Sequence, residues 1–306
     1  MAFTYHILLA LSLCLATSLA LPCTSFTVNG SNPTVFSFYR FYDFRKASAS
    51  TTLQQGQATI YQPGSGSLPP TQQVSGSSNL SDWMVQYSHR EPSLAGRPSL
   101  DYLPANVVID GPTGAKTLSL VTNRVDNDTQ QGGQLFFGLA DVTSVSFRVS
   151  AYISGDPGAV AGIFTYRNDT QESDIEVLTR ESGHNVHFTN QPSQDDNGQD
   201  VPGASQNITL PAGGTVINWM NYRLDWFKDS QESVWYVNGL KLANTTINVP
   251  EAASTLILNM WSNGGYWSGN MAVGDLATLK IRWIEVAFNS PSQPSGQPGR
   301  TCAIDP

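Results

Sequence analysis

Three acidic side chains stand at every second position of one short stretch, a spacing that could do chemistry. The stretch is QESDIEVL, residues 171–178, and its acids are Glu172, Asp174 and Glu176. In a β-strand alternate side chains point to the same face, so all three carboxylates would share one face. Same-face neighbours lie about 6.6 Å apart, and no basic residue between 168 and 179 offsets their repulsion. This repulsion should raise at least one pKa, which keeps a carboxyl group protonated for use as a general acid.

Two carboxylates that flank the anomeric carbon of a sugar are the usual equipment for glycoside hydrolysis. They lie about 5 to 5.5 Å apart in enzymes that retain the anomeric configuration, and about 6.5 to 9.5 Å apart in enzymes that invert it. From Glu172 to Glu176 a strand rises about 13 Å, so the side chains must lean together and the spacing permits either outcome. The alternative is the solvated face of an edge strand, although such faces usually mix acids with Lys, Thr and Gln.

The rest of the chain has the period-two pattern of β-strands. In VSFRVSAYI, residues 145–153, apolar and polar side chains alternate as in a half-buried strand. NYRLDWF, SVWYVNG and TLKIRWIEVAF are rich in β-branched and aromatic residues, and Asn238-Gly239 indicates a type I′ hairpin. No window has a helical stripe of useful length. We therefore predict an all-β, antiparallel fold in which two packed sheets form a β-sandwich.

The first twenty residues have the pattern of a secretory signal peptide. They contain no acid, Lys or Arg, and their apolar run is shorter than the roughly 20 residues that a membrane span needs. Residues 21–306 are expected to form a single domain. Within it, residues 46–82 are predicted to be a long low-complexity loop, and residues 289–300 resemble a linker.

Two cysteines, Cys23 and Cys302, remain after removal of the signal peptide. In an oxidising compartment they most simply form a disulfide that ties the two termini together, although two separate thiols are the alternative. Neither cysteine has a His or a second Cys at metal-ligand spacing, so no zinc site is expected. No cofactor is predicted, and nothing in the sequence identifies the ligands of a structural Ca²⁺ ion.

Several features indicate a secreted glycoprotein, extracellular or in a cell wall. Six N-x-S/T sequons follow the signal peptide, at Asn29, Asn79, Asn127, Asn168, Asn207 and Asn244. The net charge is -8, with 16 basic and 24 acidic residues, and no Lys/Arg cluster could follow a phosphate backbone. We expect a monomer whose partner is a polysaccharide, with no binding to nucleic acid or membrane.

The acidic strand and its flanks resemble glycoside hydrolase family 16, whose motif is Glu-x-Asp-x-Glu on the concave sheet of a concanavalin A-like β-jelly roll. Here the motif is Glu172-Ser173-Asp174-Ile175-Glu176. FYRFYDFR, RLDWFKDSQESVWYVNG, LILNMWSNGGYWSG and LKIRWIEVAF also resemble secreted fungal members, so the likeness covers essentially all of the mature chain. The resemblance implies a retaining mechanism with Glu172 as nucleophile, Glu176 as general acid and base, and Asp174 as the carboxylate that tunes the nucleophile.

The turn before the motif departs from the family pattern. Many relatives have Trp-Pro-Ala-x-Gly there, whereas this chain has Arg-Asn-Asp-Thr-Gln at residues 167–171. We therefore expect this turn to take part in the choice of glucan.

Aromatic and polar residues near the motif are candidates for sugar binding, because Trp and Tyr offer flat apolar platforms to pyranose rings. Trp261 and Trp267, in NMWSNGGYWSG, are predicted to line the cleft. Tyr166, His187 and Asn190 would lie on strands beside residues 172–176 if sequential strands pair, and we expect them to contact substrate. The alternative for these three is an ordinary strand surface. Four other tryptophans within alternating strands are expected in the core: Trp219, Trp226, Trp235 and Trp283.

The sequence thus predicts a secreted endo-β-glucanase that cleaves internal bonds of β-1,3/1,4-glucan through a covalent glycosyl-enzyme. A cell-wall transglycosylase would use the same carboxylates, with a sugar hydroxyl in place of water. A non-catalytic glucan-binding wall protein is the alternative of a different class. The presence of all three carboxylates argues against that third reading.

Overall fold

The structure is a computed structural model that describes residues 22–31, 35–47, 51–52, 82–211, 213–228, 231–293 and 299–305. The predicted signal peptide, most of the predicted loop at 46–82, and the sequon at Asn79 lie outside the described residues. Within them the chain is almost entirely β, with short 3-10 helices η1 (Phe44–Lys46) and η2 (Pro104–Asn106). No helix in this described part is long and apolar enough to cross a membrane.

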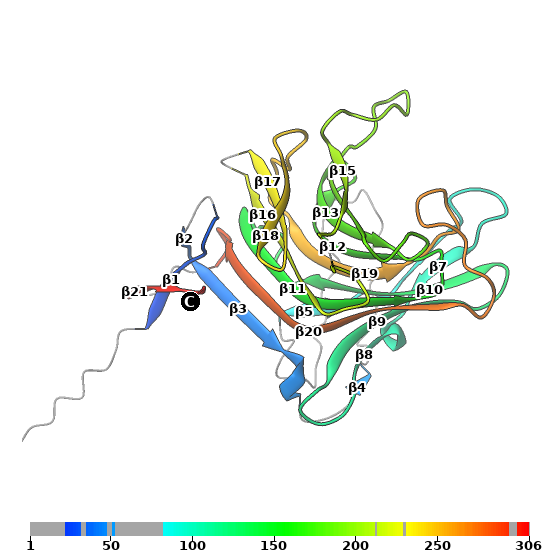
Figure 1. Cartoon of the computed structure of the whole chain (residues 1–306), viewed down its shortest axis with the longest axis horizontal. Coiled ribbons are helices and arrows are strands. Elements are labelled where there is room, and N and C mark those ends of the chain that lie inside the picture. The colour runs from blue at the N-terminus through cyan, green and yellow to red at the C-terminus, as the bar shows by residue number, and fades with distance from the viewer. Residues whose placement is uncertain are drawn as a thin grey trace, which may run out of the picture.

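One antiparallel sheet holds the acidic strand near its centre (Figure 1). Alternate side chains of its acidic strand turn to opposite faces, as the period-two pattern predicts: Ile175 is in the core, whereas Asp174 and Glu176 line a cavity. In spatial order they are β15 (Ser205–Thr209), β14 (Asn185–Gln191), β13 (Gln171–Leu178), β12 (Val160–Asn168), β19 (Thr255–Trp261), β10 (Thr129–Phe137) and β5 (Trp83–Val85). We call this the concave sheet.

The second sheet packs behind the first, and we call it the convex sheet (Figure 1). Its order is β18 (Leu240–Thr245), β17 (Glu232–Val237), β16 (Met220–Phe227), β11 (Ser144–Gly155), β20 (Leu276–Asn289), β9 (Thr117–Arg124), β8 (Val107–Asp110) and β4 (Thr51–Thr52), with β3 (Phe38–Asp43) also pairing with β20. The predicted β-sandwich is therefore confirmed.

Two strand pairs depart from the antiparallel prediction. Strand β7 (Ser99–Tyr102), which itself pairs with β6 (Ser88–Arg90), runs parallel to the first half of β10. Near the termini, β1 (Cys23–Thr27) pairs with β2 (Val35–Phe36) and runs parallel to β21 (Arg300–Ala303). In both parallel pairs the partner strands are far enough apart in sequence for a crossover, which parallel pairing requires.

The core between the sheets is filled by large aromatic side chains. Trp83, Phe188, Trp226 and Trp235 are fully buried, and Phe188 of the concave sheet stacks on Trp235 of the convex sheet at 5.6 Å between ring centroids. Truncation of such a side chain to Ala typically costs about 3 to 5 kcal/mol, so these contacts fix how the two sheets lie on each other.

Trp219 and Trp283 do not join this core, contrary to the sequence prediction, and both are half-buried. The reason for Trp283 is a β-bulge in β20, where Ser150 pairs with Trp283 but Ala151 pairs with Ile281. The extra residue reverses the alternation, so the side chain of Trp283 shares the outward face with Ser150. Trp219 lies under the guanidinium of Arg282, 3.9 Å from the ring centroid.

Local turn signals in the sequence correspond to turns in the structure. Asn238 and Gly239 join β17 to β18 with φ of 51° and 80°, the left-handed values that a type I′ hairpin needs. The turn between β12 and β13 is closed by Asn168, whose Oδ1 accepts hydrogen bonds from the backbone N and the hydroxyl of Thr170, each at 3.0 Å.

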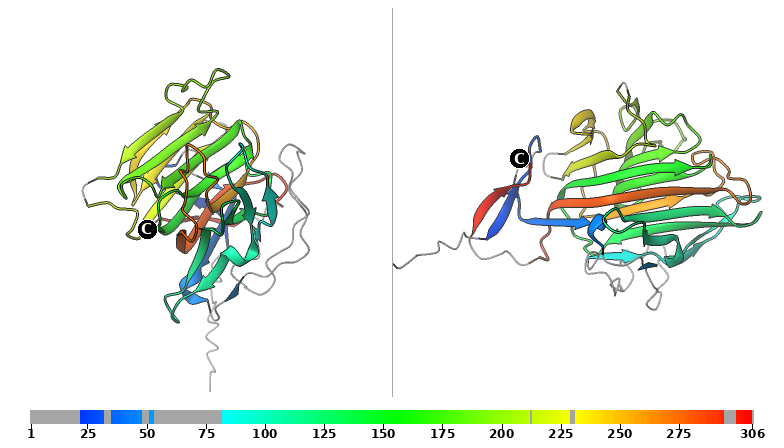
Figure 2. Two further views of the ribbon diagram at one scale, coloured as in Figure 1. Left: turned by 90° about the vertical axis from the view of Figure 1, so that its right-hand side faces the viewer. Right: turned by 60° about the horizontal axis from the view of Figure 1, so that its bottom comes forward.

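The first and last described strands meet in the small sheet of β1, β2 and β21, at one end of the sandwich (Figure 2). The predicted disulfide between Cys23 and Cys302 is present and joins β1 to β21. A bidentate ion pair also fixes this region, since Arg148 of β11 donates to both carboxylate oxygens of Asp305 at 2.6 and 2.9 Å.

Candidate active site

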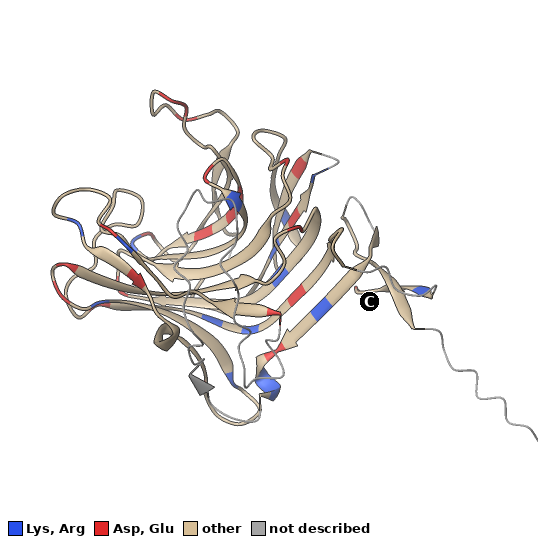
Figure 3. Cartoon of the chain, turned by 180° about the vertical axis from the view of Figure 1, so that it is seen from behind, with Lys and Arg blue, Asp and Glu red and all other residues tan. Residues whose placement is uncertain are grey.

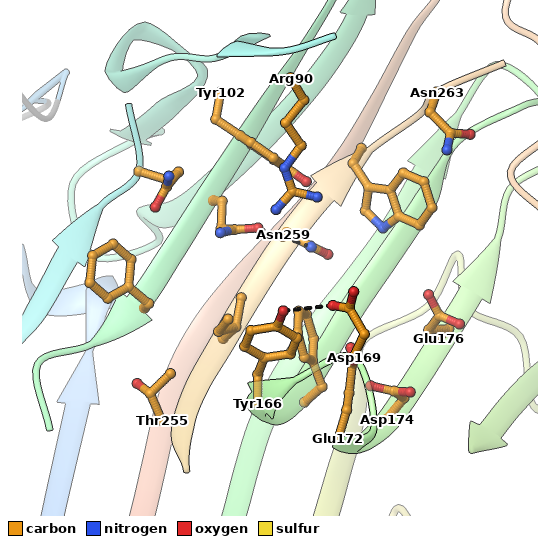
Figure 4. Close-up of a pocket in the computed structure, with 16 residues that line it drawn as sticks. Arg90, Tyr102, Tyr166, Asp169, Glu172, Asp174, Glu176, Thr255, Asn259 and Asn263 are labelled. Carbon is orange, nitrogen blue, oxygen red and sulfur yellow. Dashed lines mark hydrogen bonds between the residues drawn. The ribbon is translucent and has the colours of Figure 1, made fainter. Parts of the chain in front are cut away.

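Strand β13 presents the three carboxylates on the outer face of the concave sheet (Figure 4). The alternate residues turn the other way: Ile175 is in the core, and the buried hydroxyl of Ser173 donates to Ser233 of the convex sheet at 3.1 Å. The predicted alternation along residues 172–176 is therefore confirmed. The strand positions the acids because one of its faces is needed for the hydrophobic core.

The acids stand at one side of a cavity of about 250 Å³ that extends over β12, β19 and β10 (Figure 4). Its walls combine aromatic rings, amide groups and charged groups, the usual lining of a carbohydrate site. The lining residues are Gln86, Arg90, Tyr102, Gln134, Phe136, Phe164, Tyr166, Asp169, Glu172, Asp174, Glu176, Thr255, Ile257, Asn259, Trp261 and Asn263.

A glycine keeps the cavity floor open beside Glu176. In the register of the concave sheet, Gly162 of β12 lies between Glu176 of β13 and Asn259 of β19. A methyl group on Gly162 would stand 2.5 Å from Oδ1 of Asn259 and would displace its amide. Glycine at this position thus leaves room for a ligand between the general-acid candidate and an amide.

Burial raises the pKa of all three carboxyl groups. It lifts the pKa of Glu172 to about 8 and that of Glu176 to about 7. For Asp174, burial comes first, and the charges of Glu172 and Glu176 add to it, so its pKa is also well above the usual range. The prediction of a raised pKa is supported. Desolvation is a larger cause of the shift than the mutual repulsion of the three carboxylates.

The proton of this cluster has a preferred position. Glu172 and Asp174 are hydrogen-bonded to each other, and this bond lowers the pKa of Glu172 while it raises that of Asp174. Both pKa shifts are explained if a protonated Asp174 donates to an ionised Glu172. Burial, which raises the pKa of Glu172 to about 8, opposes its ionisation, and the hydrogen bond from Asp174 favours it; Glu176 stands apart from this pair as a separate carboxyl able to give a proton.

Trp261 and Tyr166 lie where the sequence predicts, in the cavity wall. The hydroxyl of Tyr166 donates to Oδ1 of Asp169 at 2.8 Å, which brings the turn at residues 167–171 to the edge of the cavity (Figure 4). Of that turn, Asp169 lines the cavity, and its charge also raises the pKa of Glu172.

Trp267 and His187 are near the acids but do not line the cavity. The indole N–H of Trp267 donates to Oε2 of Glu176 at 3.0 Å. His187 pairs with Glu176 across β13 and β14, and its ring packs edge-to-face on the indole at 4.8 Å between centroids.

Asn190 is a correction to the sequence prediction. It pairs with Ser173 across β13 and β14 and therefore faces the core, away from the carboxylates. Its side chain is fully buried and donates to the carbonyl of Ile247 at 2.9 Å. The predicted strand was right, but its register relative to β13 turns this side chain away from any ligand in the cavity.

Sequence reasoning missed the far wall of the cavity, formed by Gln86, Arg90, Tyr102 and Gln134. Arg90 lies over the ring of Tyr102, 5.2 Å from its centroid, and its charge lowers the pKa of Glu172 (Figure 4). Arg90 and Tyr102 end the short strands β6 and β7, Gln86 lies between β5 and β6, and Gln134 is on β10, so no single pattern in the sequence groups them. Asn259 was also missed, although its alternation with Trp261 in LILNMW would have placed it on the same face.

In the part of the chain that the structure describes, no group of three or more His, Cys, Asp and Glu residues is arranged to hold a metal ion. Within the described residues, Arg90 at the far wall is a cation whose charge acts on this cluster, because it lowers the pKa of Glu172.

No protein-family model and no curated protein matches the sequence. Solved structures do match. The endo-β-1,3-glucanase of Pyrococcus furiosus aligns with a TM-score of 0.56 over 87% of this chain and 99% of its own, at 14% sequence identity. The chain shares the fold of that glucanase. The β-glucanase of Bacillus licheniformis (TM-score 0.52, 68% of this chain and 92% of its own, 18% identity) and the endo-1,3-β-glucanase of Streptomyces sioyaensis (0.51, 82% and 97%, 14%) have the same β-jelly roll.

The raised carboxyl pKa values predict that the site destabilises the fold at neutral pH. The pKa of Glu176 rises from 4.5 to about 7 on folding, so its ionisation opposes folding as the pH increases through that window. Glu176→Gln is therefore expected to be more stable than the wild type by about 2 to 3 kcal/mol above pH 7, with the difference disappearing below about pH 4.5. Denaturant unfolding at pH 4 and pH 8 measures this, and a stability difference that is the same at both pH values would contradict it.

Proposed function

We propose that this chain is a retaining endo-β-glucanase of glycoside hydrolase family 16. The observation that supports this most is the placement of Glu172, Asp174 and Glu176 together on the floor of a cavity in the concave sheet. Their order along β13 is the order of the family motif, and the fold is the one that the glucanases share.

In the first step, a carboxylate oxygen of Glu172 attacks the anomeric carbon and forms an ester bond. The bond from that carbon to the leaving sugar oxygen breaks, and this oxygen takes the proton of Glu176. In the second step, the Glu176 carboxylate removes a proton from water while the water oxygen attacks the same carbon. The ester bond to Glu172 then breaks, and Glu176 is protonated again.

Asp174 assists both steps by holding a proton next to Glu172. Its hydrogen bond stabilises the ionised form of Glu172 before attack, and again when the carboxylate is released. Burial around the pair strengthens this interaction, because little water competes for the carboxylate oxygens.

The lining of the cavity suits an uncharged glucan. Trp261, Tyr166 and Phe164 offer apolar faces to sugar rings, while Asn259 and Gln134 offer amides to hydroxyl groups. In the described part of the chain, Lys and Arg are scattered over both sheets rather than gathered on one surface (Figure 3). This distribution gives no track for a polyanion, in keeping with the net charge of -8.

We further propose that the protein is a secreted, glycosylated monomer that meets its polysaccharide outside the cell or in a wall. The disulfide between Cys23 and Cys302 suits an oxidising compartment. The five sequon asparagines in the described residues are all exposed, as attachment of a glycan requires: Asn29, Asn127, Asn168, Asn207 and Asn244.

A substrate screen tests the proposal. Laminarin, lichenan, xyloglucan and chitin oligosaccharides are incubated with the purified protein, and the products are identified by mass spectrometry. We expect lichenan or laminarin to be shortened to oligosaccharides, and Glu172→Gln purified in parallel to be inactive. Products longer than the donor, formed when an acceptor oligosaccharide is added, would identify a transglycosylase instead. Binding of glucan with no new product would support the non-catalytic alternative.

A further inference from the structure

Trp267 touches the general-acid candidate from outside the cavity. It follows β19 in a segment, residues 262–270, that is not part of any strand, and its side chain is half-buried. Its indole N–H donates to Oε2 of Glu176 at 3.0 Å, although the two residues are 91 positions apart. Trp261, the last residue of β19, and Asn263 line the cavity, whereas Trp267 does not. Its contact is thus with the acid rather than with space that a sugar would fill.

The indole is held in place by the neighbouring strand. The ring of His187 packs edge-to-face on it, with an interplanar angle of 75°. His187 is itself fixed, because its Nε2 lies 3.0 Å from both carboxylate oxygens of Glu181. Glu181, His187 and Trp267 thus form a chain of contacts that ends at the carboxyl group of Glu176.

Hydrogen bonds within residues 262–270 stiffen the segment that carries Trp267. Oδ1 of Asn263 accepts hydrogen bonds from the hydroxyl of Ser268 at 3.0 Å and from the backbone N of Gly265 at 2.9 Å. The backbone N of Gly269 donates to the carbonyl of Gly265 at 2.9 Å. Trp267 lies within the loop that these hydrogen bonds close. The backbone that carries its side chain is therefore held in place.

An N–H at this position favours the ionised form of Glu176. Burial raises the pKa of Glu176 and the hydrogen bond from Trp267 acts against it, which leaves the pKa at about 7. As Glu176 gives up its proton, the contact becomes a charge-assisted hydrogen bond, roughly twice as strong as a neutral one. The bond therefore strengthens as the reaction proceeds, which is the condition for an interaction to accelerate a chemical step.

Other ionisable groups face Glu176 from the surrounding elements, and their charges have to be kept constant in any test. Two of these groups lie on β13 with Glu176, and a histidine on β14 is paired with a carboxylate. A further acid lies on the turn before β13, and an arginine lies across the cavity on β6. They are Glu172, Asp174, His187, Glu181, Asp169 and Arg90. Replacing Trp267 alters none of these charges.

We propose that Trp267 is a positioning residue, whose indole N–H fixes the carboxyl group of Glu176 and promotes transfer of its proton to the leaving sugar. The proposal rests on the role of Glu176 as general acid in the proposed function. Phenylalanine at position 267 keeps an aromatic ring against His187 and removes the N–H donor, so Trp267→Phe is the mildest variant that tests the N–H.

For Trp267→Phe we expect kcat on glucan to fall about 10- to 100-fold with little change in KM. The alkaline limb of the pH profile should move to higher pH by about one to two units, because the acid then holds its proton more strongly. An aryl β-glycoside with a good leaving group needs little protonation and should lose much less activity. Trp283→Phe, on the convex sheet, is the matched control and should leave profile and rates unchanged. Equal losses on both substrates with an unmoved alkaline limb would overturn the proposal.

A second readout does not depend on turnover. The Trp267 indole N–H resonance is identified in a ¹⁵N spectrum by its absence from Trp267→Phe. In the wild type it should shift with pH as Glu176 ionises, and in Glu176→Gln it should no longer respond. If the substrate screen finds no activity while this titration is observed, the proposed function fails and the contact stands. A wild-type resonance that is insensitive to pH would show that the contact is absent in solution.

Discussion

Glu172→Gln is expected to lower kcat/KM on glucan by at least about 10⁴-fold, because Glu172 is the group that we propose forms the glycosyl-enzyme. The Gln amide has nearly the shape of the Glu carboxyl group. It can fill the same space in the cavity and hydrogen-bond to Asp174, so the fold should survive. Initial rates on the best glucan of the substrate screen, with circular dichroism as the check on folding, measure the effect.

The matched variant Glu172→Ala tells a nucleophile from a residue that merely binds. Removal of the side chain leaves room for azide below the anomeric carbon, and azide should restore turnover of a glycosyl donor that has a good leaving group. Attack by azide from the side of Glu172 yields the α-glycosyl azide from a β-linked donor. Recovery of the β-azide, or activity within tenfold of the wild type, would remove Glu172 from the nucleophile position.

Glu176→Ala is expected to lower kcat on glucan by about 10² to 10⁴-fold, the range that general acid catalysis typically contributes. The loss should be much smaller for formation of the glycosyl-enzyme from a dinitrophenyl glycoside, whose leaving group needs no proton. Azide should rescue this variant by attacking the covalent intermediate, and the product should be the β-glycosyl azide. Stopped-flow release of dinitrophenol and NMR of the azide measure these two results.

A pH profile separates the two roles further. In the wild type the alkaline limb reflects loss of the proton from Glu176, whose pKa burial raises to about 7. Glu176→Ala should lose this limb, since the group that titrates is gone. An alkaline limb that persists unchanged in the variant would assign the proton donor to a different residue.

The central layout of the site could be predicted because one short-range rule governs it. Alternation along a strand places Glu172, Asp174 and Glu176 on one face, and the apolar side chains of Ile175 and Val177 require that the other face be buried. The hairpin that pairs β12 with β13 follows from the Asn168-Asp169 turn, which put Tyr166 beside the acids. The disulfide could be predicted because only two cysteines follow residue 20.

The remainder of the site depends on register and on long-range pairing, which a local pattern does not contain. Asn190 lies on the predicted strand, but which face it takes depends on its pairing with Ser173. A single bulge in β20 sends Trp283 outward, although its flanks alternate regularly. Arg90 and Tyr102 reach the cavity only because β6 and β7 pack beside β10, a parallel contact that the sequence does not signal.

The pKa values of the acids also depend partly on the local sequence pattern and partly on the tertiary structure. Repulsion between the acids can be inferred from their spacing, but the larger effect is burial, and burial depends on the walls of the cavity. The carboxyls then have different partners: Asp174 of the same strand hydrogen-bonds to Glu172, whereas the Trp267 N–H reaches Glu176 from outside β13. The sequence predicts that the acids stand together, and the tertiary structure distinguishes their roles.

Trapping the covalent intermediate tests the proposed role of Glu172 as nucleophile most directly. The protein is incubated with a 2-deoxy-2-fluoro-β-glucosyl oligosaccharide that has a dinitrophenyl leaving group, since the fluorine slows hydrolysis of the ester more than its formation. Digestion and tandem mass spectrometry then locate the added sugar. The account predicts one sugar adduct, on Glu172 within QESDIEVL, and none in Glu172→Gln. An adduct on another residue, or turnover of the glucan without any adduct and with inverted product, would contradict it.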